Sequence, residues 1–342
     1  MAARGLTAGW AAAMSLALVG QAIAADPAME KVRKAVAPVE AATVKPVSFF
    51  LFADTQVSYR YSFPASEPGV PNLKTADPLD GRDIPKHILN ISHADAWEYG
   101  TNFFSLDILK SGSQDPAGTS NGPGGTNILY DYGATEAYGL YRGTLSLTKL
   151  TGATVFAYPG LIKDVSLSFG FDMNAKNTVF GPMKRDVVGG LSFAIDVPAG
   201  FLNVAVHAYK ERNRNGFVPE PFRSVEFDTV PEFEIVYSFP LDSFLGGFPL
   251  KLAGFNNIVL PKGNGGIPGT APTNVEFLSR TNLVLDVGKL VWNQPGKLDA
   301  FVGFQYWRNK FGVDQDIGFA QGGAGPGAEE KSFLAGISVH VF

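Results

Sequence analysis

The sequence contains no cysteine in 342 residues, which excludes a disulfide framework, a zinc–thiolate site and a thiol nucleophile. Charged residues are also scarce, at 18% of the chain, while 45% is hydrophobic, so the chain is not intrinsically disordered. There are only 5 methionines but 27 phenylalanines and 39 glycines. This balance disfavours a helix-rich enzyme and suits a β protein whose surface partly faces an apolar medium.

A basic stripe is missing as well. The formal net charge is −4, so no nucleic-acid partner is expected. The sequence has no G-x-S-x-G motif and no phosphate-binding loop. Beyond the N-terminal segment no apolar run reaches the length of a membrane-spanning helix, so none is predicted there.

The N-terminal segment 1–24 has the three parts of a secretory signal peptide. Arg4 supplies the positive charge, Ala11–Val19 the short apolar stretch and Ala22–Ala24 the A-x-A cleavage site. Because the apolar stretch is too short for a membrane anchor, we expect the segment to be cleaved. Residues 25–46, which are polar and then interrupted by prolines, are interpreted as a periplasmic N-terminal leader.

From residue 47 onward, apolar and polar residues alternate. Val165, Leu167 and Phe169, for example, alternate with Ser166 and Ser168, which indicates a β-strand with two different faces. Twelve such segments are predicted, at 47–61, 87–97, 101–110, 134–149, 163–174, 185–196, 201–211, 230–239, 249–258, 276–287, 297–308 and 332–342.

The connections between these segments alternate in length. They are mostly long and rich in Gly, Pro, Asn and Ser after the odd-numbered segments, and shorter after the even-numbered ones, which is typical of an outer-membrane barrel. A soluble β-sandwich or periplasmic barrel would also show this alternation. However, nearly every strand carries bulky apolar side chains on one face, and those of twelve strands together exceed what one small core can bury. The sequence therefore predicts an all-β fold, a single antiparallel transmembrane β-barrel of about 12 strands over residues 47–342, located in the cell outer membrane.

Aromatic residues near the predicted strand ends fit the girdles that mark membrane interfaces. They are Tyr59, Tyr61, Phe63, Trp97, Tyr99, Phe239 and Trp307. The facing of the last segment stays open, because Phe342 falls on the same parity as Ser338 and His340, whereas Val339 and Val341 form the apolar parity.

Two motifs stand out in the first half of the chain. They are Ser92–Asp107, which includes Trp97-Glu98-Tyr99-Gly100, and the spacing Glu136-x-Tyr138-x-x-Tyr141-Arg142-Gly143. Together they resemble the nucleoside-specific channel family (Tsx-like) of Gram-negative outer membranes. The resemblance implies a twelve-stranded barrel and a narrow, monomeric channel for nucleosides and similar small solutes. It also implies that surface loops can serve a phage or a bacteriocin as a receptor.

The polar parity of the strands supplies the residues that would line the barrel interior. The channel-lining candidates are Asp54, Arg60, Asp107, Glu136, Tyr138, Arg142, Asp172, Asn203, His207, Glu234, Arg280 and Asn282. A nucleoside is neutral and combines a flat base with a hydroxyl-bearing ribose, so its site needs aromatic faces and hydrogen-bonding side chains. Those residue types are present, but opposed arginines and carboxylates also form purely structural networks.

The histidines do not predict an enzyme. Ser92 and His93 are adjacent and would point to opposite faces of a strand, while Ser338 and His340 share a face without an evident third member. His93 and Asp95 are metal-ligand types at i, i+2, but two ligands without a third are weak evidence for a metal. We therefore expect no catalytic residue, no metal and no cofactor.

The predicted function is an outer-membrane channel for the diffusion of small polar solutes, with nucleosides favoured. Two alternatives stay open: a general or differently specific small-solute porin, and a surface receptor barrel with a plugged lumen. The expected partners are outer-membrane lipid, small polar solutes and, at the surface loops, a phage or bacteriocin.

Overall fold

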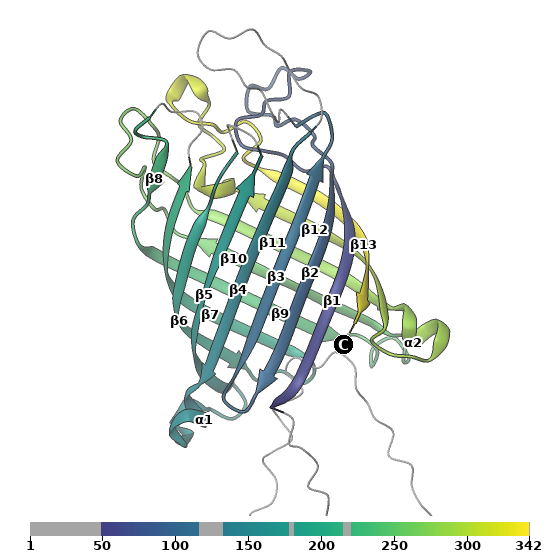
Figure 1. Ribbon diagram of the computed structural model, residues 1–342. Helices are drawn as coiled ribbons and strands as arrows, with labels where there is room; N and C mark the ends of the chain where they lie inside the picture. Colours follow the sequence, from purple (N-terminus) through teal and green to yellow (C-terminus); the bar gives the residue numbers. More distant parts are fainter. Residues whose placement is uncertain (1–48, 116–132, 178–180, 215–219, 342) are drawn as a thin grey trace, which may run out of the picture.

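The computed structural model describes residues 49–115, 133–177, 181–214 and 220–341. Twelve long strands form the wall of a barrel, and the chain runs back and forth between its two ends (Figure 1). The wall strands are β1 (Phe50–Phe63), β2 (Lys86–Trp97), β3 (Gly100–Ser111), β4 (Thr135–Ser146), β5 (Ile162–Lys176), β6 (Arg185–Ile195), β7 (Phe201–Arg214), β9 (Val230–Pro240), β10 (Leu250–Val259), β11 (Glu276–Asp286), β12 (Leu298–Arg308) and β13 (Glu330–His340).

The sheet is closed and entirely antiparallel. Consecutive wall strands pair with each other, and β1 pairs with β13, so no wall strand is left with a free edge. The three-residue strand β8 (Ser224–Glu226) pairs only with the last three residues of β7, Arg212–Arg214. Closure gives the wall's backbone amides and carbonyls partners on both sides, as a hydrocarbon environment requires. The prediction of a single antiparallel barrel of about 12 strands is confirmed.

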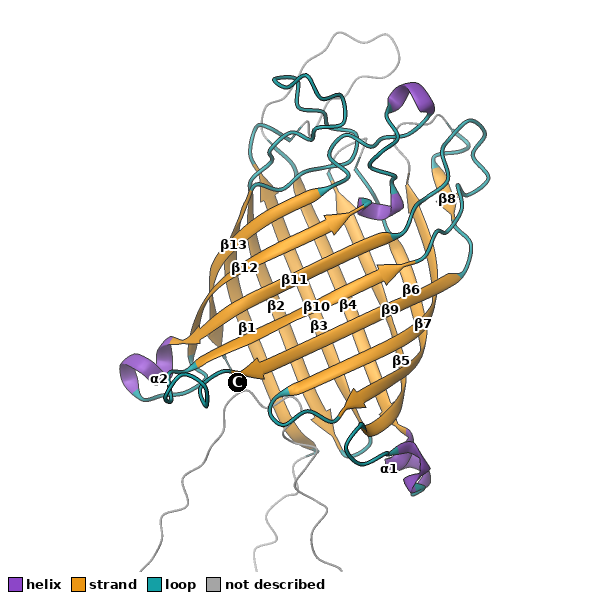
Figure 2. Cartoon of the chain, turned by 180° about the vertical axis from the view of Figure 1, so that it is seen from behind, coloured by secondary structure: helices purple, strands orange, loops and turns teal. Residues whose placement is uncertain are grey.

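The two ends of the barrel differ, as the lengths of the connections predict. Residues 49 and 341 lie at the end with the short connections (Figures 1 and 2). That end also carries the helices α1 (Leu147–Thr151), η2 (Thr154–Phe156) and α2 (Val287–Trp292). The other end carries β8, η3 (Lys310–Gly312), η4 (Phe319–Gln321) and the long loops. Outer-membrane barrels have short periplasmic turns and longer extracellular loops, so we name the two ends accordingly.

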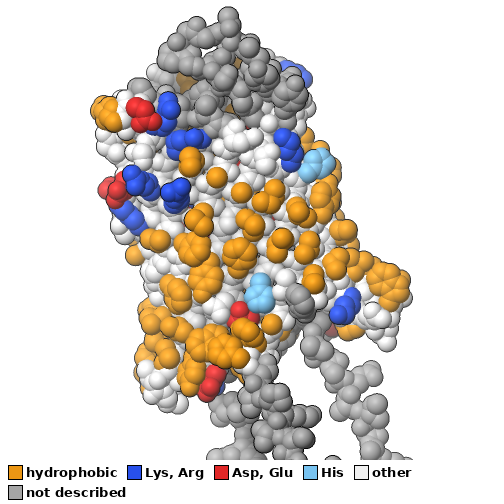
Figure 3. Space-filling model, viewed as in Figure 1, with side chains coloured by type: hydrophobic (Ala, Val, Ile, Leu, Met, Phe, Trp, Pro, Cys, Tyr) orange, Lys and Arg blue, Asp and Glu red, His pale blue; other side chains and the backbone are white. Residues whose placement is uncertain are grey.

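Apolar side chains cover the outer wall (Figure 3). Val302 in the middle of β12 is 58% exposed and Phe333 on β13 is 64% exposed, which is costly in water but favourable in hydrocarbon. On the last strand Ile337 is exposed whereas Ser332 and Ser338 are buried, so the apolar parity of β13 faces outward. The structure thus answers the question of its facing.

The prediction that Trp307 belongs to an interface girdle is wrong. Trp307 lies on the inner face of β12, where its indole Nε1 donates to Glu276 Oε1 at 3.0 Å and the ammonium of Lys310 lies 4.6 Å from the ring centroid. The residue is close to the extracellular end, where parity rather than depth decides whether a side chain meets lipid.

The predicted signal peptide 1–24 and leader 25–46 fall outside the described residues, as does Phe342. No helix within the described ranges is long and apolar enough to cross a membrane.

Candidate functional site in the barrel lumen

All twelve channel-lining candidates lie on the inner face of their strands, on the side opposite the exposed apolar residues. All but Asn203 and Asn282 form hydrogen bonds or ion pairs with other inward side chains. The structure therefore brings most of them together as networks. These networks differ between the two ends of the barrel.

The extracellular end is organised around Glu67, which belongs to the loop between β1 and β2. Its carboxylate contacts Lys86, and lies 3.5 Å from Lys176 Nζ and 3.8 Å from Lys310 Nζ. Burial alone would raise the pKa of Glu67, but the three ammonium groups hold the pKa of this carboxyl well below its usual range. Because Lys86 and Lys176 come from the wall and Lys310 from another loop, Glu67 fastens its own loop into the mouth of the barrel.

The three lysines around Glu67 are not free to bind a solute anion. Each one also meets a second carboxylate. The pairs are Lys86–Glu136 at 3.5 Å, Lys176–Asp115 at 2.8 Å and Lys310–Glu330 at 2.7 Å. The four carboxylates of this cluster thus neutralise its three ammonium groups without a solute anion.

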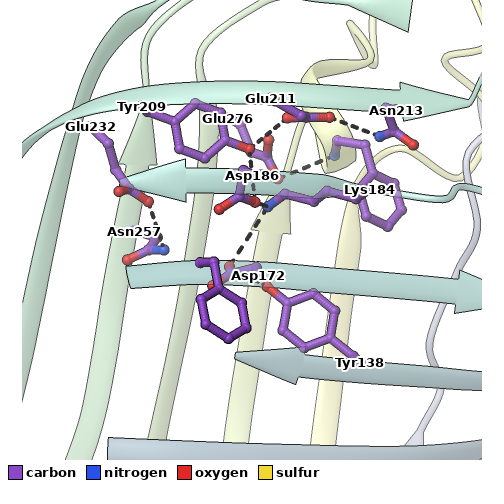
Figure 4. A network of polar contacts seen from close by, with 12 residues as sticks. Tyr138, Asp172, Lys184, Asp186, Tyr209, Glu211, Asn213, Glu232, Asn257 and Glu276 are labelled. Atoms are coloured by element: carbon purple, nitrogen blue, oxygen red, sulfur yellow. Dashed lines mark hydrogen bonds and ion pairs between the residues drawn. The ribbon is translucent and has the colours of Figure 1, made fainter. Parts of the chain in front are cut away.

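A second network lies in the same half of the lumen, with residues on β4 to β7, on β9 to β11 and in the extracellular loops (Figure 4). Its carboxylates are shared among lysine ammoniums and tyrosine hydroxyls, so that each charge has a partner. The contacts are Tyr138–Asp172 at 2.6 Å, Lys184–Asp186 at 3.1 Å, Tyr209–Glu211 at 2.5 Å, Asn213–Glu211 at 2.8 Å, and Lys262–Glu211. Removing one partner of such a buried ion pair strands the other charge, so the network resists opening, although Asp186 Oδ1 has no hydrogen-bond partner among the described residues.

Arg142 on β4 links distant parts of the wall. Its Nη1 lies 2.5 Å from Asp172 Oδ1 on the adjacent strand, and its Nε donates to Glu234 Oε2 on β9 at 3.0 Å. In the sheet order β4 and β9 are separated by β5, β6 and β7, so this pair reaches over the lumen. Phe103, which faces Arg142 in register on β3, is 36% exposed although it lies on the inner face. Accessible space therefore begins beside this pair.

A buried chain of contacts joins β5, β7 and β9. Ser168 Oγ lies 2.9 Å from His207 Nε2, and His207 Nδ1 lies 3.1 Å from Glu232 Oε2. The contact passes over Gly190 on β6, which is the register partner of both Ser168 and His207 and has no side chain to obstruct it.

This arrangement has the order of a nucleophile, a base and an orienting acid. However, Ser168 is only 5% exposed, His207 2% and Glu232 1%, so no incoming carbonyl reaches the hydroxyl. We interpret the three residues as part of the packing of the wall. Sequence reasoning missed the Ser168 contact because the partner lies two strands away, not on the strand of His207.

A polar chain also crosses the outer wall near its periplasmic end. Thr55 Oγ1 lies 2.7 Å from His93 Nδ1, and His93 Nε2 lies 3.4 Å from Asp95 Oδ2. Asn102 donates to Asp95 Oδ1 at 2.8 Å and in turn accepts from the Tyr141 hydroxyl at 2.7 Å. The backbone amides of β1 to β4 at this level are engaged in the ladder, so none is aimed at an oxyanion. We assign it no catalytic role.

The predicted pair His93 and Asp95 is found together in that chain, but without a third ligand. Within the described ranges, no group of three or more His, Asp or Glu side chains is arranged to hold a metal ion.

Smaller groups of contacts lie elsewhere in the lumen. Arg60 pairs with Asp107, and the guanidinium of Arg280 is held by Gln305 Oε1 at 2.6 and 2.8 Å. At the periplasmic end, Asp54 and Asp299 share His340, with distances of 2.9 and 3.4 Å, and Lys251 contacts Asp299 at 2.8 Å.

A hollow of about 830 Å³ lies among the extracellular loops, above the networks. It is bounded by Glu67, Asp115 and Lys176 on the side of the lumen and by Phe227 and Phe311 among the loop residues. The packed half of the lumen therefore separates this vestibule from the periplasmic half.

Several residues of these networks were missed by sequence reasoning. They are Glu67, Lys86, Lys176, Lys184, Glu211, Glu232, Lys262, Lys310 and Glu330. Those on strands share the inward parity: Glu211 and Glu232 lie within predicted segments, and Lys86, Lys176 and Glu330 could have been found by extending them. Those in loops give no signal in the sequence, because only the folded loop brings them inward.

The sequence matches no protein-family model and no curated protein sequence. Solved structures with a similar fold include the translocator domain of the autotransporter NalP from Neisseria meningitidis, 10% identical over 84% of this chain and 88% of that chain, with a TM-score of 0.37. The outer membrane protein opdK from Pseudomonas aeruginosa is 8% identical over 86% and 100% of the chains, with a TM-score of 0.29. A BenF-like porin from Pseudomonas fluorescens is 8% identical over 86% of this chain and 100% of that chain, with a TM-score of 0.28. These identities are too low to transfer a function.

Proposed function

We propose that the protein is a narrow outer-membrane channel for small polar solutes. The observation that carries the proposal is the inner surface beside Arg142, where accessible space ends against an ion pair that reaches over the lumen. A pore bounded by matched charges of both signs does not exclude neutral solutes by charge. The closed sheet and the apolar outer wall supply the membrane-embedded frame that such a channel needs.

We further propose nucleosides as the solutes to be tested first. Phe103 offers an exposed ring for stacking with a base, and Arg142 and Glu234 offer a donor and an acceptor beside it. Asn203 and Asn282 add amides on the inner wall without being engaged in the networks described above. A flat base and a ribose match this combination of a ring with hydrogen-bonding groups.

Single-channel recording in planar bilayers tests the proposal. We expect small unitary currents that adenosine or uridine blocks in a concentration-dependent way. Replacing Phe103 with Leu retains the apolar volume but removes the aromatic face, so it should weaken the block while conductance persists. Steady ohmic current that nucleosides do not change would instead indicate a general or differently specific porin.

A receptor barrel with a plugged lumen is the second candidate, and the fastening of Glu67 favours it. If the wild-type protein and a Glu67→Ala variant both insert into the bilayer and neither conducts, the channel proposal fails. The long extracellular loops would then be the functional surface, and a phage or bacteriocin would be the partner to test.

A further inference from the structure

Three connections at the periplasmic end expose large apolar side chains below the barrel wall. We call them the periplasmic collar. Its members are Leu150, Val155, Tyr158 and Leu161 around α1, Phe244, Leu245 and Phe248 between β9 and β10, and Leu290, Val291 and Trp292 in α2. Exposure reaches 80% at Val155 and 84% at Phe244, more than at the apolar residues of the wall itself. Soluble surfaces rarely show so much clustered apolar area.

The two helices of the collar begin in the same way. Ser146 and Asp286 are the last residues of β4 and β11, and each caps its helix by accepting a hydrogen bond from the backbone N–H three residues later, at 3.1 and 2.7 Å. In both cases a lysine follows at that third position and a leucine after it. The caps redirect the chain at the end of the strand, so that both helices project sideways from the rim (Figures 1 and 2).

Charge in these two connections has one sign. Residues 147–161 contain Lys149, and residues 287–297 contain Lys289 and Lys297, with no aspartate or glutamate in either range. Apolar side chains combined with lysines on a short helix are typical of segments that lie in the membrane interface, where lysines meet lipid phosphates.

The apolar outer wall continues directly into the collar. Phe49 stacks on Trp97 at the periplasmic end of β1 and β2, with ring centroids 5.6 Å apart. The connection between β9 and β10 lies against the start of α2, since the backbone N–H of Asp286 donates to the carbonyl of Pro249 at 3.0 Å. Because the collar connections follow directly on β4, β9 and β11, the collar lies at the same end of the barrel as these aromatic residues of the outer wall.

We propose that the periplasmic collar binds the phospholipid leaflet on the periplasmic side, with its apolar side chains at the boundary between headgroups and acyl chains and its lysines against anionic headgroups. The collar then fixes the depth of the barrel in the membrane. This inference concerns how the barrel is embedded and holds for a channel and for a plugged receptor alike.

The tryptophans allow a direct test. The sequence has four, Trp10, Trp97, Trp292 and Trp307, so three Trp→Phe replacements leave Trp292 alone in the full-length protein. In phospholipid vesicles we expect its emission to be blue-shifted and quenched more by bromine atoms near the headgroup than by bromine near the chain end. The variant retaining only Trp307, which faces inward, should not be quenched by either lipid, and serves as the matched control.

Quenching of Trp292 fluorescence by acrylamide dissolved in the aqueous phase gives the results that would contradict the proposal. If acrylamide quenches Trp292 fully and brominated lipids do not quench it, the collar is in water and the proposal is wrong. If neither quencher reaches Trp292, the collar is covered by protein, either a second copy or a periplasmic partner, and the proposal is equally overturned.

The lysines are tested by charge reversal. Lys149→Glu, Lys289→Glu and Lys297→Glu together should reduce folding into vesicles that contain phosphatidylglycerol severalfold, but not into neutral phosphatidylcholine vesicles. The same reversal at Lys74, Lys210 and Lys331 on the extracellular side should give no such lipid dependence. Equal behaviour of the two triple variants in both lipids would contradict the role of the collar lysines.

Discussion

The extracellular and periplasmic halves of the lumen are built from the same alternating strands, yet they differ in packing. In the extracellular half most inward side chains are buried, including Arg60, Lys86 and Tyr209. In the periplasmic half most are only half-buried, and Phe103 is exposed. The wall alone does not account for this difference, because its strand pairing continues unchanged from one half to the other.

The difference arises from what enters the barrel at each end. Loop residues such as Glu67, Lys262 and Lys310 add charges to the extracellular half, and each finds a partner on the wall. The periplasmic connections instead turn outward into α1 and α2. If the protein is the channel proposed above, permeation is therefore expected to be controlled at the extracellular side.

The largest expected effect is that of Glu67→Ala. Removing this carboxylate leaves three lysines without their shared partner, and breaking a buried ion pair costs about 3–5 kcal/mol. After incubation in SDS at increasing temperatures, we expect the faster-migrating folded band to disappear at a lower temperature than in wild type. We also expect a larger unitary conductance. If the variant is as stable as wild type and conducts no better, the extracellular half is not held closed by Glu67, and the proposed difference in packing between the two halves is wrong.

The pH dependence of the stabilisation by Glu67 provides a second test of the comparison between the two halves. Because the pKa of Glu67 is lowered in the folded protein, its contribution is complete above the unfolded-state value near 4.5 and is lost as the pH falls toward the folded-state value. The stability difference between wild type and Glu67→Gln, measured by heat modifiability, should therefore be greatest at neutral pH and shrink in acid. A difference that grows as the pH falls would have the wrong sign.

Accessibility can be measured on a clean background, since the sequence has no cysteine. We expect Phe103→Cys to react readily with a small thiol reagent supplied from the periplasmic side. Val188→Cys, at a buried inward position of the extracellular half, should react much more slowly. Comparable labelling rates would mean that water fills both halves equally.

The smallest effect is expected for Asp54→Asn at the periplasmic end. Asp54 pairs with His340 at 2.9 Å, but its side chain is 17% exposed, so water replaces part of the lost interaction. The loss of stability should be clearly smaller than that of Glu67→Ala, because Asp54 loses one ion-pair partner rather than three and asparagine keeps one side-chain oxygen as an acceptor. A loss as large as that of Glu67→Ala, measured in the same assay, would show that the two ends are equally packed.

Strand positions were predicted well because the alternation has a period of two and is local. The predicted segments 87–97 and 249–258 have the least regular patterns, and both are found as full strands, β2 and β10. Parity also assigned Arg142 and Asp172 to the interior correctly. The assignment of Trp307 to an interface girdle failed because it used only the position near a strand end, whereas the parity that Trp307 shares with Gln305 places it inside.

The sequence by itself determined the closed twelve-stranded wall, its inner and outer faces and the end that carries the long loops. These features follow from side-chain alternation and from the spacing of turns, both readable along the chain. Only the tertiary structure decided which charges meet inside. Glu67 with Lys176, Arg142 with Glu234, and Ser168 with His207 are brought together by closure of the sheet and by loop folding, and such contacts leave no periodic signal in the sequence.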